Sequence, residues 1–530
     1  MSYKRIETKN YQDLMEKYNI KSLLAKIVSS FDYSSYDETV FFANNLNYQF
    51  DEKIFLPIKE ILQKIKKEDI KVFIFGDYDC DGICATTILC MLLDKLNIKY
   101  GYYLPDRQTE GYGLNLLRLK QAYEKGYRAL ITVDNGVSCM EQINWATEHN
   151  MQVIVTDHHT IPSNFKCEYF LHPSLLKIDY QYLSGAAVVY LLSRYLNLND
   201  DKMEILAMLS ILSDVMPLKG INIKIVQEGI NLFNRHLYYN LEALEKLNYP
   251  VNETDLSFKI IPKINSLGRM SDKANVNIMV KYLLCTDKNI IDNYAIEINK
   301  VNKLRQQITT EQYNKIMPLI NEQDKYNFIY MNNLHEGLLG LLAGKLTSTT
   351  GKPSFIMTSS LEEIKGSARS LKEDDLMTLL ADFKADFLKM GGHANACGFS
   401  IKEEKIPLFK EYLDKHSQLF SNDSLIQYID IKQEELTKEN IKEVFDYRPY
   451  GHQRALPFLH IKFTNLKDYK MLKNDHQLKW TTADNLQLIS FENDGYNKYL
   501  NVNELEVIGE LQENVFNGRI NYQIMIKEIL

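Results

Sequence analysis

The chain has 530 residues, 45% of them hydrophobic and 25% charged, and a formal net charge of −7. This apolar content at so small a net charge excludes a mainly disordered chain. At about 100–200 residues per domain, the length predicts three or four domains.

The absence of an apolar run of about 18 residues predicts no membrane span. The polar start MSYKRIETKN predicts no signal peptide. Seven scattered cysteines without a Cys-x-x-Cys pair favour a reducing cytoplasm over a zinc site or disulfide framework.

Residues 1–50 read as a polar, helical or irregular extension. From residue 71 to about 215, short apolar runs alternate with helical stretches. The expected strands are Lys71–Phe75, Ala129–Val133 and Met151–Thr156, and the expected helices are Ile83–Leu96 and Met140–Glu148. Continuous apolar strands that alternate with helices are typical of a parallel sheet covered on both faces. The predicted class is therefore α/β, with a doubly wound parallel sheet.

The later part of the chain changes character twice. A stretch without Gly or Pro predicts one long helix over about 288–318, and strand-like runs at 328–331 and 354–360 indicate a second, smaller α/β unit. After about residue 425, regular short β-rich runs suggest a small β-barrel. We divide the chain into an N-terminal extension (1–50), a first α/β domain (51–287), a connecting helix (288–322), a second α/β domain (323–425) and a barrel (426–530).

Acidic side chains follow each expected strand of the first sheet. The first strand leads into Asp77, Asp79 and Asp81, the second into Asp134, and the third into Asp157-His158-His159; Asp214 ends a further apolar run. The carboxyl ends of parallel strands share one sheet edge, where ligands bind. Converging carboxylates repel one another unless a cation neutralises them. Aspartate oxygens and imidazole nitrogens suit Mn²⁺ or Mg²⁺.

The number of candidate ligands exceeds what one catalytic ion needs. We therefore expect two divalent cations about 3.5–4 Å apart, the spacing used for in-line phosphoryl displacement, with a bridging aspartate and a water as nucleophile. Each motif alone has a plainer interpretation: a helix cap for Asp-x-Asp, a turn for Asp134-Asn135-Gly136, and a structural pair for the two histidines. Their joint occurrence after successive strands favours the metal site.

These motifs together resemble a known family. GDYDCDG (76–82), VDNG (133–136), TDHH (156–159) and SDVMPL (213–218) are similar to the four motifs of the DHH phosphoesterase superfamily. The segments EGYG, PKINSLGRM, KGSARS, GGHANACGFS and RPYGHQRALPF extend the likeness, over residues 50–530, to its single-strand-specific DNA exonucleases. The resemblance implies metal-dependent 5′→3′ hydrolysis of single-stranded DNA to 5′-mononucleotides, in DNA repair and recombination. It also implies a DHH-associated second domain and an OB-fold-like barrel.

The resemblance also implies roles for particular residues. It assigns metal binding to Asp77, Asp79, Asp81, Asp134, His158 and Asp214. We expect His159 to act on the scissile phosphate, and Asp157 to orient the histidine rings. Phosphate binding is expected of Arg269, Ser367, Arg369, Gly391, Gly392 and His393, and single-strand binding of Lys473, Lys479 and Trp480. Tight turns, salt bridges and a solvated lysine surface are the plainer interpretations of these last two sets.

One position departs from the family pattern, because Ile223 follows Asn222 where the family usually has arginine. This puts an arginine contact there in doubt. Two other functions stay open: a phosphodiesterase acting on short oligonucleotides or cyclic dinucleotides, and a non-catalytic single-strand-binding scaffold. The expected partners are single-stranded DNA, a helicase and a single-strand-binding protein, with no membrane, and the chain is expected to be a monomer.

Overall fold

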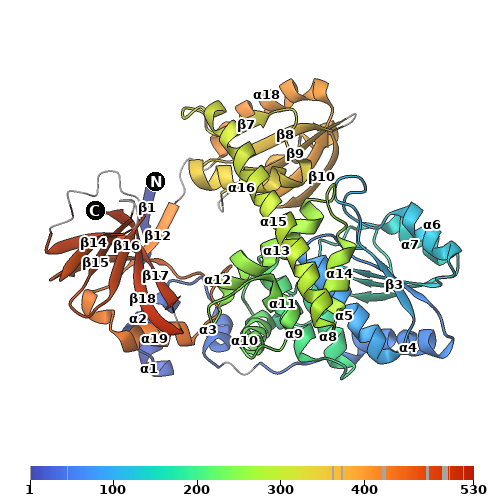
Figure 1. The fold of residues 1–530 in the computed structure, drawn as a ribbon, viewed down its shortest axis with the longest axis horizontal. Coiled ribbons are helices and arrows are strands. Elements are labelled where there is room, and N and C mark those ends of the chain that lie inside the picture. The colour runs from blue at the N-terminus through green and yellow to red at the C-terminus, as the bar shows by residue number, and fades with distance from the viewer. Residues whose placement is uncertain are drawn as a thin grey trace.

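The computed structural model describes residues 2–43, 46–360, 363–371, 374–420, 425–472, 477–491, 499, 502–516 and 518–530. These residues form three sheets with helices around them (Figure 1). Within the described ranges, no helix has both the length and the apolar character needed to cross a bilayer.

The first sheet is parallel throughout, with strand order β3-β2-β4-β5-β6. Its strands are β2 (Val72–Phe75), β3 (Tyr100–Tyr103), β4 (Ala129–Val133), β5 (Gln152–Thr156) and β6 (Tyr169–Leu171). Successive side chains enter opposite cores: Ile74 packs into the larger core, whereas Phe73 and Phe75 pack into the smaller one. The sheet is therefore covered on both faces, which confirms the doubly wound α/β prediction.

Helices of the first domain supply these two cores. They are α4 (Glu52–Lys67), α5 (Cys80–Leu96), α6 (Leu116–Glu124), α7 (Met140–Glu148), α8 (Gly185–Tyr195), α9 (Asp201–Ser213), α10 (Ile221–Phe233), α11 (Tyr239–Leu244), α12 (Glu253–Asp255), α13 (Ile261–Arg269) and α14 (Asn277–Leu284). Helix α5 contributes to the larger core, and α6 and α7 contribute to the smaller one.

A single long helix, α15 (Lys288–Ile316), leads from the first domain to the second (Figure 1). The Asp287 side chain caps its start by accepting hydrogen bonds from the backbone of Asn289 and Ile290. The helix spans 29 residues without Gly or Pro, as the sequence predicted.

The second domain is built on a five-stranded mixed sheet of order β10-β11-β9-β8-β7. The strands are β7 (Asn327–Tyr330), β8 (Ser354–Ser360), β9 (Glu363–Arg369), β10 (Phe387–His393) and β11 (Ala396–Ile401). Helices α16 (Leu339–Thr350), α17 (Leu376–Leu379) and α18 (Ile406–His416) accompany the sheet. Helix α16 packs against β8 and β9, whereas Phe409 and Leu413 of α18 belong to a separate aromatic core.

The third sheet joins both ends of the chain, in the order β1-β12-β13-β17-β18-β16-β15-β14. Its strands are β1 (Ser2–Arg5), β12 (Leu425–Asp430), β13 (Phe458–Thr464), β14 (Asp468–Leu472), β15 (Gln477–Thr481), β16 (Gln487–Ser490), β17 (Glu504–Phe516) and β18 (Arg519–Ile529). Strand β1 pairs in parallel with β12. Helices α1 (Tyr11–Tyr18), α2 (Ser22–Ser29), α3 (Ser35–Ala43) and α19 (Lys438–Asp446) accompany this sheet. Most of the expected N-terminal extension is therefore part of the barrel domain.

Candidate metal and phosphate site

The acidic residues after β2 and β4, the two histidines after β5 and Asp214 at the end of α9 meet at one edge of the first sheet. Their ligand atoms form three groups, each with all members within 4.8 Å of one another. The groups are Asp77 with Asp79 and Asp134, Asp134 with His158 and His159, and Asp81 with His158 and Asp214. Because Asp134 and His158 each belong to two groups, the three form one continuous cluster. All six expected metal ligands thus lie together.

Local backbone structure holds the first carboxylates in place. Asp79 caps the start of α5 and accepts a hydrogen bond from Gly82 at 3.1 Å. Asp81, in the first turn of α5, accepts backbone hydrogen bonds from Gly185 and Ala186, both at 2.7 Å. The Ser210 hydroxyl also donates to Asp81, at 2.5 Å. Asp81 is therefore tied to the start of α8 and to α9.

Asp134 comes directly after β4 with a φ of 59°, in the left-handed region. A β-carbon at Gly185 would lie 2.6 Å from Cβ of Asp134 and 2.7 Å from Oδ1 of Asp134, so only glycine allows the two residues to approach this closely. The Nε2 atom of His158 lies 3.1 Å from Asp134 Oδ1, 3.6 Å from Asp81 Oδ2 and 3.7 Å from Asp214 Oδ2. His158 thus stands at the centre of three carboxylates.

His159 is oriented by Asp157 rather than by the cluster. Its Nδ1 lies 2.8 Å from Asp157 Oδ1, which also accepts backbone hydrogen bonds from His158 and His159. The other oxygen of Asp157 accepts from Val137 at 2.9 Å. Burial lowers the pKa of His159, but the hydrogen bond and charge of Asp157 outweigh it and raise this pKa to about 9. His159 is therefore cationic at neutral pH.

Two residues around His159 were not predicted from the sequence. The hydroxyl of Tyr112 lies 3.1 Å from Nδ1 of His159. Nε2 of His172 lies 2.9 Å from the backbone carbonyl oxygen of His159. Tyr112 belongs to the EGYG motif, to which no role was attached. A motif with no charged side chain at the contacting position gives little chemical signal on its own.

Burial and the charges of neighbouring carboxylates act together on the aspartates of the cluster. Burial, followed by neighbouring carboxylates, raises the pKa of Asp77 and of Asp134 well above the usual value. The same causes raise the pKa of Asp81 to about 6 and that of Asp214 to about 8. The Oδ1 atom of Asp77 is buried and accepts no hydrogen bond from a described residue, and Oδ1 of Asp134 is buried beside His158. These oxygens and the imidazole of His158 fit hard divalent cations.

A cluster of arginines lies beside the acidic cluster. Burial, and then the charges of Arg107, Arg369 and Arg305, lower the pKa of Arg269 to about 9, whereas Asp79 opposes the shift. Such unbalanced positive charge suits a phosphate group. Arg269 and Arg369 were expected from the sequence, but Arg107 was not. Arg107 lies in the loop after β3, with its guanidinium carbon 5.0 Å from the ring centre of Tyr78.

The other expected phosphate-binding residues occupy neighbouring strands of the second domain. Gly391 of β10 is opposite Gly398 of β11, which is opposite Ser367 of β9. Arg369 donates a hydrogen bond to the Ser367 hydroxyl at 3.1 Å. Gly392, next to Gly391, has a φ of 150°. The backbone of His393 continues β10, but its side chain lies outside the described residues.

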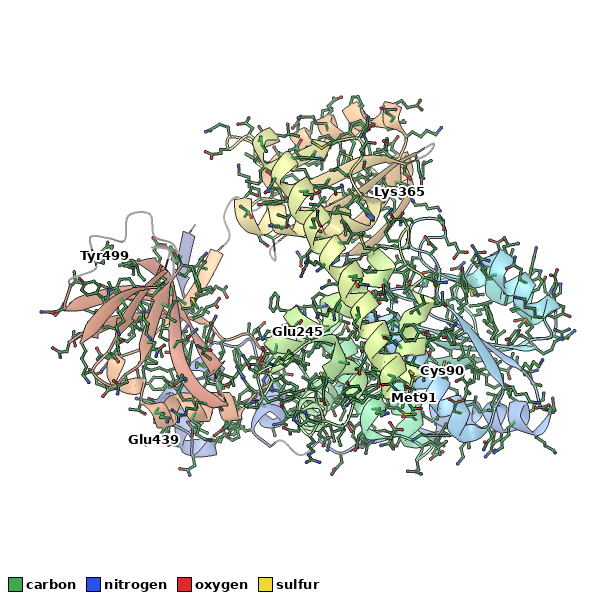
Figure 2. All side chains as sticks on the ribbon, viewed as in Figure 1. Cys90, Met91, Glu245, Lys365, Glu439 and Tyr499 are labelled. Atoms are coloured by element: carbon green, nitrogen blue, oxygen red, sulfur yellow. The ribbon has the colours of Figure 1, made fainter. Side chains whose placement is uncertain are left out.

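Contacts between the two domains bring these strands towards the metal cluster. Lys365 of β9, labelled in Figure 2, donates to the carbonyl of Gln108 at 2.7 Å. His335 pairs with Asp272 at 3.0 Å. A β-carbon on Gly337 would collide with the backbone carbonyl of Arg269, so the second domain touches the residue that ends α13.

The barrel residues agree less well with the sequence analysis. Trp480 is only 1% exposed, and its indole N–H donates to the carbonyl of Tyr499 at 3.2 Å. The prediction that Trp480 stacks on a base is therefore wrong, because its ring is part of the barrel core. Lys479 on the same strand is partly exposed, and Lys473 lies outside the described residues.

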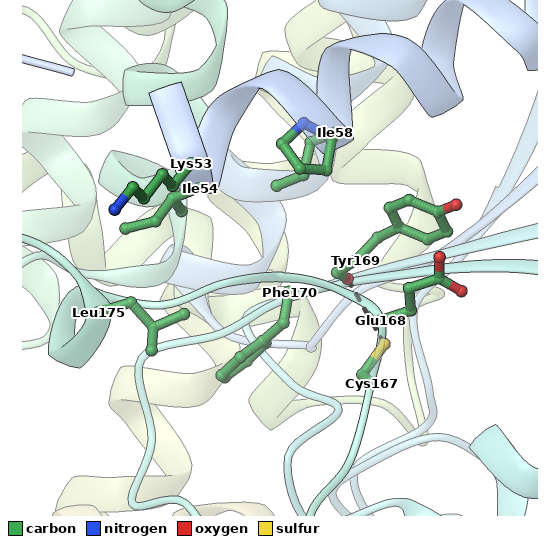
Figure 3. A pocket seen from close by; sticks show the side chains of 9 residues that line it. Lys53, Ile54, Ile58, Cys167, Glu168, Tyr169, Phe170 and Leu175 are labelled. Carbon is green, nitrogen blue, oxygen red and sulfur yellow. Dashed lines mark hydrogen bonds between the residues drawn. The ribbon is translucent and has the colours of Figure 1, made fainter. Parts of the chain in front are cut away.

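A separate cavity of about 240 Å³ lies between α4 and the segment around β6 (Figure 3). Its lining includes Lys53, Ile58, Glu168 and Phe170. None of the cluster carboxylates lines it, so it is not part of the candidate site.

Three family models match the chain in order. The DHH family N-terminal domain matches residues 71–213, the DHHA1 domain matches 323–417, and the RecJ OB domain matches 429–528. The single-stranded-DNA-specific exonuclease RecJ of Bacillus subtilis is 26% identical over 98% of this chain and 69% of that protein. The Escherichia coli protein of the same name is 25% identical over 89% of each.

The chain is similar to RecJ proteins along almost its whole length, in all three domains. The crystal structure of RecJ in complex with Mn²⁺ from Thermus thermophilus has the same fold, with a TM-score of 0.83 over 100% of this chain and 79% of that one, at 21% identity. A crystal structure of exonuclease RecJ bound to manganese matches 71% of this chain and 97% of that one, at 25% identity and a TM-score of 0.60. The succession of DHH, DHH-associated and OB domains is thereby confirmed.

Proposed function

We propose that this chain is a metal-dependent exonuclease that degrades single-stranded DNA from the 5′ end and releases 5′-mononucleotides. The observation that carries the proposal is the position of the arginine cluster beside six clustered metal-ligand candidates. The RecJ relatives, named as single-stranded-DNA-specific exonucleases, support it. A role in DNA repair and recombination in the cytoplasm, beside a helicase and a single-strand-binding protein, belongs to the same proposal.

Six residues would hold two divalent cations, Mn²⁺ or Mg²⁺: Asp77, Asp79, Asp81, Asp134, His158 and Asp214. When bound, such cations activate water at neutral pH and neutralise charge on the phosphate. The buried Oδ1 of Asp77, which accepts no hydrogen bond from a described residue, supports this assignment. Asp134, which belongs to two of the three ligand groups, is the residue best placed to serve both ions.

His159 would act on the scissile phosphate. The hydrogen bond to Asp157 fixes the ring, and a pKa of about 9 keeps it protonated at neutral pH. A fixed cation of this kind stabilises negative charge that develops on a phosphate oxygen, and it can give a proton to the leaving oxygen. Asp157 would serve as a positioning residue, because its contacts are with backbone N–H groups and with His159.

Arg269, Arg369 and Ser367 would bind the terminal 5′-phosphate, with Gly391 and Gly392 allowing close backbone approach. A pocket of this kind stops the strand at a fixed distance from the metal cluster and so explains release of single nucleotides. The barrel would bind the strand further along, with Lys479 as a candidate contact.

A timed digestion tests the proposal. The substrates are 5′-phosphorylated and 5′-hydroxyl single-stranded 50-mers, a duplex and a dinucleotide, each with Mn²⁺, Mg²⁺ or EDTA. We expect mononucleotides from the phosphorylated single strand with either cation, and none with EDTA. Asp134→Asn should abolish the activity, because it removes a charge shared by two ligand groups.

Asp69→Asn is the matched control, because the side chain of Asp69 is 74% exposed and lies outside the cluster. It should keep the wild-type rate. Rapid cleavage of the dinucleotide without cleavage of the 50-mer would favour a phosphodiesterase of short substrates instead. Strand binding without any cleavage would favour a scaffold, and equal rates on the two 5′ ends would contradict the phosphate pocket.

A further inference from the structure

The backbone directly after Asp214 adopts a conformation that its sequence disfavours. Asp214 caps the end of α9, and Val215 follows with a φ of 51°, in the left-handed region. Met216 donates to the carbonyl of Ile211 at 3.0 Å, which gives the turn the hydrogen bond of a Schellman motif. Glycine is usual at this position, and a β-branched residue is rare there because its side chain crowds the backbone.

Packing of the Val215 side chain does not compensate for its unfavourable left-handed backbone conformation, since the residue is 63% exposed. The turn is instead held from outside by a segment at the edge of the barrel domain. Nδ1 of His452 lies 2.8 Å from the carbonyl oxygen of Val215, and a carbonyl can only accept, so Nδ1 donates. In return, the backbone N–H of Leu218 donates to the carbonyl of His452 at 3.0 Å.

This barrel segment, residues 448–454, is itself firmly anchored, and we call it the interdomain strap. Arg454 is 1% exposed, and its guanidinium carbon lies 4.1 Å from the ring centre of Phe41. Gly451 and Arg454 exchange two backbone hydrogen bonds, at 2.9 and 3.3 Å. The N–H of Tyr450 donates to Glu253 of the first domain at 3.2 Å. The strap can therefore act as a fixed support for the turn after Asp214.

Asp214 is a candidate ligand that the surrounding protein encloses only in part. Its side chain is 28% exposed, whereas those of Asp81, Asp134 and His158 are at most 5% exposed. It also enters the site from the end of a helix and not from a strand of the sheet. Its carboxylate position is therefore set by a turn that carries an unfavourable backbone angle.

We propose that His452 is a positioning residue that holds Asp214 in the metal site through the carbonyl of Val215. The proposal rests on the proposed function only in requiring that the cluster bind divalent cations. It makes the barrel domain a structural part of the metal site, in addition to any contact with DNA. Side chains that orient metal ligands without touching the metal commonly contribute about tenfold or more to affinity.

Mn²⁺ binding to the full-length chain without DNA, measured by calorimetry, tests the proposal. His452→Ala should weaken Mn²⁺ binding about tenfold, because the turn loses its outside donor. His452→Asn should bind closer to wild type, since the asparagine amide can donate near the position of Nδ1. Val215→Gly combined with His452→Ala should restore affinity, because glycine adopts this backbone angle without support.

Wild-type affinity in His452→Ala, or no recovery in the double variant, would overturn the proposal. Circular dichroism checks that each variant folds. Should His452→Ala unfold, the comparison of His452→Asn with His452→Gln replaces it. The extra methylene of glutamine places its amide further from the backbone than Nδ1 of histidine, so equal Mn²⁺ affinities of the two variants would overturn the proposal. Absence of Mn²⁺ binding by the wild-type chain would refute the metal site itself, whereas binding that His452 does not influence would refute only the positioning role.

Discussion

At the scale of single residues, Asp157 and His159 show how a buried carboxylate sets the charge of its neighbour. Asp157 is fully buried, and the hydrogen bond from His159 lowers its pKa although burial alone would raise it. The same bond raises the pKa of His159 to about 9. The pair is therefore an ion pair at neutral pH, and His159 is a proton donor throughout the physiological range.

Asp157→Asn tests this pairing. Without the negative charge, the pKa of His159 should fall towards its ordinary value of 6.5. The wild-type rate should decline only as the pH rises through about 9, where His159 loses its proton; the variant should decline at lower pH. At pH 8 a pKa of 6.5 would leave only about 3% of His159 protonated, so we expect kcat to fall by up to about 30-fold. A pH–rate profile measures both effects, and an unmoved alkaline limb would contradict the assigned role.

The sequence predicted individual residues well where strand order alone determines position. Asp77, Asp134 and His158 each follow a parallel strand directly, so the common edge of the sheet brings them together. Arg107 and Tyr112 were missed because they belong to a loop whose path depends on tertiary contacts. Trp480 was misassigned because an alternating strand does not reveal which of its faces is buried.

At the scale of elements, the start of α8 determines how the metal cluster is assembled. Its first two N–H groups donate to Asp81, and Gly185 lets the helix lie against the side chain of Asp134. Negative charge at a helix start is favourable, because the exposed N–H groups and the helix dipole both stabilise it. One helix end therefore orients two carboxylates, one in the first turn of α5 and one directly after β4.

Gly185→Ala tests this arrangement. The new β-carbon would lie 2.6 to 2.8 Å from atoms of the Asp134 side chain, so this side chain must move. We expect Mn²⁺ affinity to fall at least about tenfold and activity to be lost. Gly344→Ala on α16 is the control, because its β-carbon would meet only Arg369 Cγ, at 3.9 Å. Calorimetry and the digestion assay compare the two variants; unchanged Mn²⁺ binding by Gly185→Ala would contradict the account.

Element prediction succeeded for long patterns and failed for short ones. The uninterrupted polar helix at Lys288–Ile316 and the apolar strands β4 and β5 agree with the sequence to within a few residues. Strand β3 contains tyrosine and glycine without a buried face, and β6 has three residues, so neither gives a periodic signal. Strand β1 exists only because a distant partner, β12, pairs with it.

At the scale of the whole molecule, the N-terminal helices and the C-terminal barrel form one folding unit. Leu23, Leu24 and Ile27 of α2 share a core with Ile429 and Trp480. Lys26 of α2 also pairs with Glu435 at 2.6 Å. These contacts join segments about as far apart as the chain allows, and sequence patterns report only local order. The unit could therefore not be predicted from the sequence.

Leu24→Ala tests this shared core. Leu24 is fully buried, so its truncation should lower the free energy of unfolding by about 2–5 kcal/mol. Trp480 reports the barrel by fluorescence in a Trp145→Phe background, because the chain contains two tryptophans. Leu117→Ala on the exposed side of α6 should change stability by no more than about 0.5 kcal/mol. If Leu24→Ala left the urea midpoint unchanged, the barrel would not depend on α2.

The central claim is that the carboxylates after β2 and β4 bind divalent cations together with His158 and Asp214. Anomalous diffraction from a crystal soaked in Mn²⁺ measures this directly. The account predicts anomalous peaks within ligand distance of Asp134 and His158, absent from an Asp134→Asn crystal. Side chains turned apart, with no anomalous density among them, would contradict it.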